Sequence, residues 1–116
     1  MSTSLSEQLE SLKGAAYSLD EDAVQENLFN LGAISLSRKQ SPEEVVDFLL
    51  ALLKDDYFNS ENIAGHLLNY FEFESAHLSA FQKNKITEWI ANYGAKFTST
   101  HGNQVVCELN NDEYLK

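Results

Sequence analysis

The sequence has one cysteine, few basic residues and no long apolar run. Cys107 is the single cysteine, which excludes an internal disulfide framework and is typical of a reducing compartment. The longest uninterrupted apolar stretch runs only from Phe48 to Leu53, whereas a membrane-spanning helix needs roughly 20 apolar residues. The N-terminal segment carries acids where a signal peptide needs basic residues. These absences predict a soluble cytoplasmic protein that does not use a membrane.

Basic residues are scarce, and the acidic residues are unevenly distributed. The 18 Asp and Glu against 8 Lys and Arg give a net charge of −10. Fourteen of these acids and four of the bases lie between Met1 and Glu74, and four of each follow from Ser75 to Lys116. So few bases argue against nucleic-acid binding, which needs Lys and Arg for phosphate contacts. The excess of acids favours steered association with a basic protein surface.

The first part of the chain has the pattern of a helical domain. With 116 residues, 43% of them hydrophobic and 11% aromatic, we expect one domain over residues 1–116. Three S-x-x-E capping boxes precede apolar periodic runs: Ser4/Glu7, Ser18/Glu21 and Ser41/Glu44, the last with Pro42 at the first helical position. Five helices are predicted within residues 1–94, namely Ser4–Tyr17, Leu19–Arg38, Pro42–Lys54, Ser60–Phe73 (with Asn59 as another cap) and Ser75–Tyr93, which Gly94 ends.

The C-terminal part of the chain has a different pattern. Two β-prone runs, Lys96–Thr100 and Gln104–Leu109, flank His101-Gly102-Asn103, whose glycine suits a tight turn. We therefore predict a short β-hairpin over residues 95–109. Residues 110–116 are expected to form a frayed tail.

Short links between the five predicted helices imply antiparallel neighbours, in a helical bundle or a stack of helical hairpins. The stretch Ser41–Phe73 resembles a HEAT-type helical hairpin. It has the leucines of one amphipathic helix, the acidic turn Asp55-Asp56, and then Ile63, Ala64, Leu67 and Leu68. The resemblance implies an all-α fold in which two amphipathic helices pack closely through the small Ala64.

In size, acidity and helical pattern the chain also resembles bacterial immunity proteins, including those of contact-dependent growth inhibition systems. The resemblance implies an antitoxin that covers the active site of a basic toxin domain, often a nuclease. Charge would speed the encounter of such a pair, and buried aromatic residues would supply binding energy.

Three acidic segments are the candidate partner-binding residues. They comprise Asp20, Glu21, Asp22 and Glu26, then Glu43 and Asp47, and lastly Asp55, Asp56, Tyr57 and Phe58. The first two segments begin predicted helices, where acids also interact favourably with the helix dipole. The third follows a helix, where acids oppose the dipole, so the dipole does not explain these acids and partner contact is an open interpretation for them.

The sequence contains no recognisable catalytic or metal-binding pattern. Cys107 and the histidines, which are His66, His77 and His101, do not have the spacing of a zinc site. A glycine-rich phosphate loop is also missing. We therefore expect no enzyme activity, cofactor, metal or small-molecule substrate. Two other functions stay open, a helical adaptor or regulatory subunit and a phosphotransfer domain using His77.

Overall fold

The computed structural model describes residues 4–109, and helices make up most of that range. Six α-helices and three 3₁₀ turns follow in the order α1 Leu5–Tyr17, α2 Glu21–Arg38, α3 Glu43–Leu53, η1 Asp56–Phe58, α4 Asn62–Phe73, η2 Ser75–His77, α5 Ala80–Tyr93, η3 Gly94–Lys96 and α6 Thr100–Leu109. The predicted all-α class is confirmed, with six helices in place of five. None of the described helices combines the length and the apolar character needed to cross a membrane.

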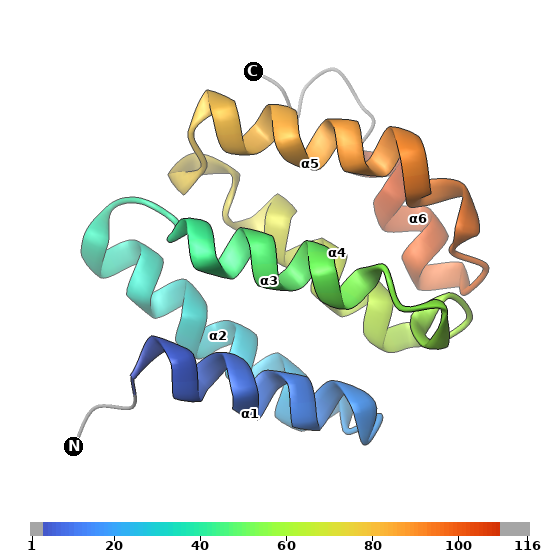
Figure 1. Cartoon of the computed structure of the whole chain (residues 1–116), viewed down its shortest axis with the longest axis horizontal. Helices are drawn as coiled ribbons and strands as arrows, with labels where there is room; N and C mark the ends of the chain where they lie inside the picture. The colour runs from blue at the N-terminus through green and yellow to red at the C-terminus, as the bar shows by residue number, and fades with distance from the viewer. Residues whose placement is uncertain (1–3, 110–116) are drawn as a thin grey trace.

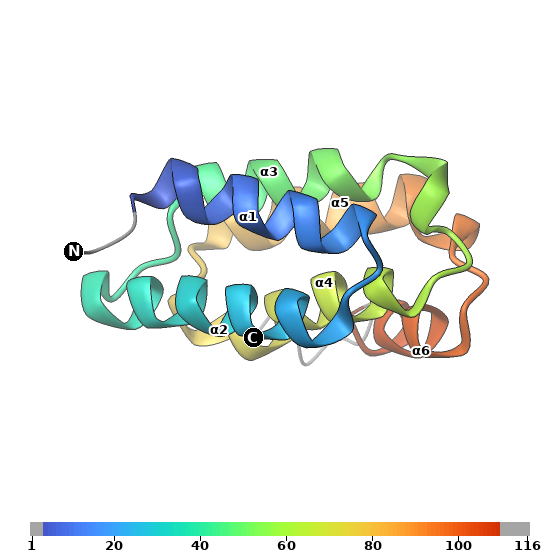
Figure 2. The same cartoon turned by 90° about the horizontal axis from the view of Figure 1, so that it is seen from below.

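The six helices form three hairpins stacked in two layers (Figures 1 and 2). Helices α1, α3 and α5 form one layer, and α2, α4 and α6 form the other (Figure 2). The odd-numbered helices all run in one direction, and the even-numbered helices run back (Figure 1). The links therefore alternate between two ends of a slab that measures 40 × 32 × 18 Å. This is the stacked-hairpin arrangement, one of the two that the sequence left open.

A continuous apolar core lies between the two layers. Each of the first five helices contributes at least one side chain that is fully buried, for example Leu12, Leu31, Leu49, Leu67 and Ile86. Burying one such side chain stabilises the fold by roughly 1.5–3 kcal/mol. The core therefore holds the helix ends, and the residues on them, in fixed relative positions.

Of the first two predicted helix starts, the structure confirms one and corrects the other. Ser4 caps α1 as predicted, because its hydroxyl accepts a 3.2 Å hydrogen bond from the Glu7 backbone N–H. The predicted start at Leu19 is wrong, since Leu19 has a left-handed φ of 55° that a right-handed helix cannot include. Asp20 caps α2 instead, through a 3.2 Å bond from the backbone N–H of Ala23.

The next two predicted caps are wrong because their residues are used in the links. Ser41 is buried between the hairpins, where its N–H donates to His77 O and its carbonyl accepts from Gln82 Nε2. No side chain caps α3, whose N-cap is Pro42. Asn59 continues turn η1, and its carbonyl accepts the Thr98 N–H at 2.7 Å, so α4 begins after Glu61.

The predicted fifth helix is shorter than expected. Ser75 begins turn η2, and Ser79 caps α5 through a reciprocal capping box with Gln82. Gly94 follows α5 with a right-handed φ of −61°, so it is not the left-handed C′ residue that was predicted. A Cβ on Gly94 would lie 3.0 Å from Val106 Cγ1, which explains the glycine by close packing.

The predicted C-terminal β-hairpin is wrong. Residues 100–109 form α6, which packs against α4 and buries four residues of one face: Gly102, Val105, Val106 and Leu109. A strand would send Val105 and Val106 to opposite faces, whereas helical spacing puts both against the core. The local β-preference of this segment is overridden by that burial. The expected tail, residues 110–116, lies outside the described residues.

Candidate functional site

The alternation of the links brings two of the predicted acidic segments to the same end of the slab. The α1–α2 turn and the α3–α4 link both lie there, and α2 and α4 begin there (Figure 1). We call this region the acidic end, and it comprises Asp20, Glu21, Asp22, Asp55, Asp56 and Glu61. Acids at the starts of α2 and α4 also interact favourably with the dipoles of both helices. The end is therefore compatible with the fold, and its six acids outnumber the two lysines that residues 4–109 bring to the same end, Lys54 and Lys96.

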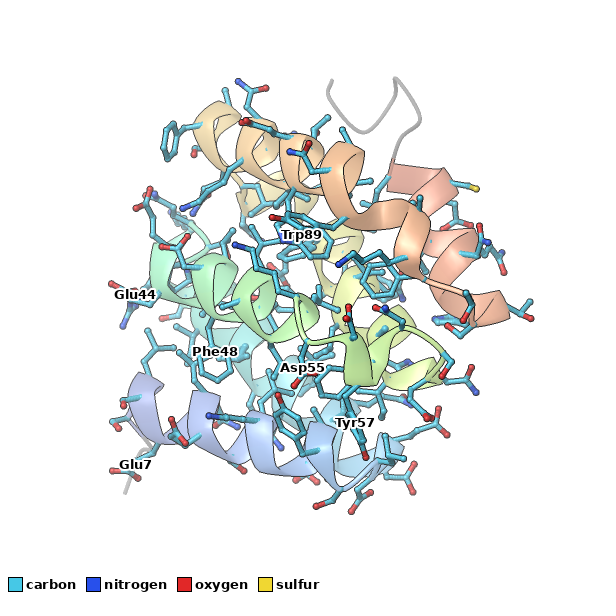
Figure 3. The ribbon with its side chains drawn as sticks, turned by 45° about the vertical axis from the view of Figure 1, so that its right-hand side comes forward. Glu7, Glu44, Phe48, Asp55, Tyr57 and Trp89 are labelled. Atoms are coloured by element: carbon cyan, nitrogen blue, oxygen red, sulfur yellow. The ribbon has the colours of Figure 1, made fainter. Side chains whose placement is uncertain are left out.

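A network of tyrosines and one carboxylate holds the two segments together. The Tyr17 hydroxyl donates a 2.5 Å hydrogen bond to Asp55 Oδ2, and the Tyr57 hydroxyl donates to Tyr17 O at 3.2 Å. Asp55 Oδ1 also accepts the Tyr57 backbone N–H at 2.9 Å. Figure 3 shows Asp55 and Tyr57 beside the last turns of α1. Asp55 therefore has a structural role in joining the first two hairpins.

The same network affects the ionisation of its members. The hydrogen bond from Tyr17, followed by the backbone bond from Tyr57, lowers the pKa of the Asp55 carboxyl. The same hydrogen bond raises the pKa of the Tyr17 hydroxyl, because the bond to Asp55 favours its protonated form. Asp55 therefore stays a carboxylate to a lower pH than an isolated Asp would.

Several acids of this end have partners within the chain. Glu21 Oε1 lies 3.1 Å from His66 Nε2, and Asp56 Oδ1 lies 3.5 Å from Lys96 Nζ. Asp20 is the cap of α2. Asp22 is exposed, and no ion pair forms at it within residues 4–109. Asp22 is thus well placed to meet a partner.

The two aromatic residues of this segment have different surroundings. Tyr57 is 45% exposed, and its ring packs at a tilt against the Tyr17 ring, with 5.5 Å between the ring centroids. Phe58 is fully buried, and its ring packs against the other side chain of this pair, Tyr17, with 4.9 Å between the ring centroids. The prediction that Phe58 contacts a partner is therefore wrong, since its side chain is part of the core.

The remaining predicted acids lie away from the acidic end. Glu43 and the neighbouring Glu44 begin α3 at the opposite end of the slab (Figure 3 labels Glu44). Asp47 forms an ion pair with Lys85 between α3 and α5. Glu26 is exposed in the second turn of α2, beyond the acidic end. The topology therefore divides the three predicted segments, with parts of the first and third at the acidic end and the second on α3 away from it.

A groove of about 480 Å³ between α2 and α4 was not expected from the sequence. Its most exposed apolar side chains are Phe29 at 77%, Leu36 at 67% and Phe73 at 77%. Phe29 and Leu36 are seven residues apart, so they lie on one stripe of α2 that differs from the buried stripe through Val24 and Leu31. That second stripe is visible in the sequence, and the fold adds that no other helix within residues 4–109 covers it.

The histidines do not gather into a metal centre. His66 and His101 have ring centroids 5.2 Å apart, and His77 Nδ1 lies 2.9 Å from Glu74 Oε2. Within residues 4–109 no three His, Cys, Asp or Glu side chains are grouped so that they could hold a metal ion. The hydrogen-bond partner of His77 is thus a carboxylate rather than a base.

Comparison of the chain with known protein families, curated proteins and solved structures gives no match. The function therefore has to be argued from this chain alone.

Proposed function

We propose that the chain is a non-enzymatic binding protein whose acidic end docks on a basic protein surface. The proposed partner is a toxin domain with a basic active site, such as a nuclease, which makes the chain an immunity protein or antitoxin. The observation that carries the proposal is the meeting of residues 20–22, 55–56 and 61 at one end of the slab. A nuclease must attract a polyanion, so its active site is complementary in charge to such an end.

The arrangement supports a mechanism of steering followed by occlusion. A net charge of −10 accelerates encounter with a basic surface. Exposed Tyr57 then provides an aromatic anchor among the carboxylates, and such anchors dominate binding energy at protein interfaces. Because Tyr17 and Asp55 already fix this segment, little ordering entropy remains to be lost on binding. The single cysteine is consistent with action in a reducing cytoplasm.

A second candidate function, a helical adaptor in a larger assembly, is favoured by one observation. The groove between α2 and α4 leaves Phe29, Leu36 and Phe73 exposed together. Contiguous exposed apolar residues of this kind mark protein-interaction sites. An adaptor would bind through this groove, whereas the antitoxin would bind through the acidic end.

The proposal is tested by using the tagged chain and its charge-reversed variants to capture binding proteins from the native host. Asp22→Lys with Asp56→Lys changes one acid in each converging segment. Glu43→Lys with Glu44→Lys is the matched control, because it makes the same charge change in the first turn of α3 at the opposite end. We expect the wild type and the control to retain one stoichiometric basic protein that the first variant loses.

The captured protein is then expressed alone and together with this chain. Lethality that this chain suppresses would establish the antitoxin function. Equal capture by both variants, or no captured basic protein, would contradict docking at the acidic end. A harmless partner lost only on substitution of Phe73 would replace the antitoxin with the adaptor.

A further inference from the structure

The groove between α2 and α4 has carboxylates at both ends. Glu21 lies where α2 begins, beside His66 in the lining of the groove. Glu74 lies where α4 ends, and a Cβ on Gly32 would be only 2.8 Å from its Oε1. The absence of a side chain at Gly32 thus allows the Glu74 carboxylate to lie against α2. The lining between these two ends is mainly apolar.

The length of the groove fits a short helix. Its lining on α2 runs from Gln25 to Leu36, a distance of about 16 Å at 1.5 Å per residue. The lining on α4 runs from His66 to Glu74, parallel to it. A helix of about three turns spans such a distance, and its apolar stripe repeats at i, i+4 and i+7.

The exposed aromatic rings along the groove are not needed by the core. Phe73 is exposed while Phe71 on the same helix is fully buried, so α4 already has its apolar face inside the slab. Phe29 has the same relation to Leu31 on α2. These rings gain free energy of roughly 25 cal/mol per Å² only when another surface covers them.

We propose that the groove binds an amphipathic helix of a partner protein, about three turns long, with apolar side chains facing Phe29, Leu36 and Phe73 and a Lys or Arg near the end where α2 begins. The basic residue would pair with Glu21, whose side chain is 49% exposed, whereas Glu74 is largely buried and already pairs with His77. This inference does not rest on the antitoxin proposal, because the apolar lining of the groove carries it and Glu21 is the one residue of the acidic end that it uses.

Charge distinguishes such a partner from a second copy of this chain. Helix α2 carries Glu21, Asp22 and Glu26 against Arg38, and α4 carries Glu72 with no base. Two copies facing each other through this groove would bring the acids of α2 together in a chain of net charge −10, whereas Glu72 lies beside Glu108 of α6. A basic helix relieves the same repulsion, so it is the better occupant.

A designed peptide tests the groove directly. The probe is a fluorescein-labelled helical peptide of about fifteen residues, or four turns, with leucines at i, i+4 and i+7 and lysines at both ends. Its control has the same composition with the leucines spread around the helix. Fluorescence anisotropy with the full chain measures both affinities. We expect the patterned peptide to bind at least tenfold more tightly than the control.

Variants of the chain assign that binding to the groove. Phe29→Ser and Phe73→Ser are each expected to weaken it at least tenfold, while Phe81→Ser, at a 65% exposed position on α5, leaves it unchanged. The inference would be overturned if the two peptides bound with equal affinity, or if Phe73→Ser bound the patterned peptide as tightly as the wild type does. It would also be overturned if binding of the patterned peptide did not saturate up to about 1 mM of the chain. A dimer in sedimentation that Phe73→Ser dissolves would overturn it in favour of self-association. None of these results affects the acidic end, which the lysine variants test separately.

Discussion

Phe71 and Phe73 stand two residues apart at the end of α4 and have opposite surroundings. Phe71 is fully buried and Phe73 is exposed. Phe71→Ala is expected to lower the free energy of unfolding by about 3–5 kcal/mol, because it leaves a cavity in the core. Phe73→Ala should change it by less than about 0.5 kcal/mol. Urea unfolding followed by circular dichroism measures both, and similar losses for the two would contradict the assigned faces of α4.

Glu72 has a carboxyl whose ionisation opposes folding. Burial, and then the hydrogen bond and charge of Glu108, raise the pKa of the Glu72 carboxyl above its ordinary 4.5. The folded state therefore holds this proton more tightly, and stability falls as the pH rises from 4.5 through the raised value. At pH 7, Glu72→Gln should therefore raise the free energy of unfolding by no more than about 1 kcal/mol. Its midpoint temperature in thermal unfolding should be correspondingly higher than that of the wild type.

The pH dependence of that gain is its control. Well below pH 4.5 the carboxyl is protonated in both folded and unfolded states, so the gain from Glu72→Gln should disappear. Glu108→Gln should give part of the same gain, since it removes the neighbouring charge. Glu10→Gln, on the exposed face of α1, should give none. A gain at Glu72 that stays constant with pH would disprove the electrostatic cause.

At the scale of helices, local signals in the sequence predicted much of the fold. Capping at Ser4 and apolar periodicity identified the first four helices to within a few residues. The errors arose where a residue has long-range partners, as Ser41 has with His77 and Gln82. The start of α5 is marked in the sequence by the S-x-x-Q form of the capping box, Ser79 with Gln82.

Helix α6 could not be predicted because its stability comes from α4. A Cβ on Gly65 would overlap the His101 ring and lie 3.1 Å from the Gly102 backbone N. Gly65→Ala is therefore expected to destabilise the protein by about 1–3 kcal/mol, although alanine favours a helix by roughly 1 kcal/mol over glycine. Amide hydrogen exchange should show the greatest loss of protection within residues 100–109.

Gly14→Ala on α1 is the matched control. A Cβ at Gly14 has nothing within 4 Å, so only the helix preference acts and stability should rise by up to about 1 kcal/mol. If Gly65→Ala also stabilised the chain, the close packing of α4 on α6 would be wrong.

At the scale of the whole molecule, the candidate site depends on topology. The acidic segments were visible in the sequence, but the sequence did not show that 20–22 and 55–56 share an end while 43 and 47 do not. That division follows from odd and even helices running in opposite directions (Figure 1). The groove depends on topology as well, since α2 and α4 lie side by side and none of the helices described between residues 4 and 109 lies over them.

The most direct test of docking at the acidic end is the rate at which the captured partner associates with this chain, measured at increasing salt. For the wild type we expect a fast rate that falls as salt screens the charges. Asp22→Lys with Asp56→Lys should reduce the rate by at least about tenfold at low salt, and Glu43→Lys with Glu44→Lys should have much less effect. Equal rates for the two variants, or a rate independent of salt, would contradict the account.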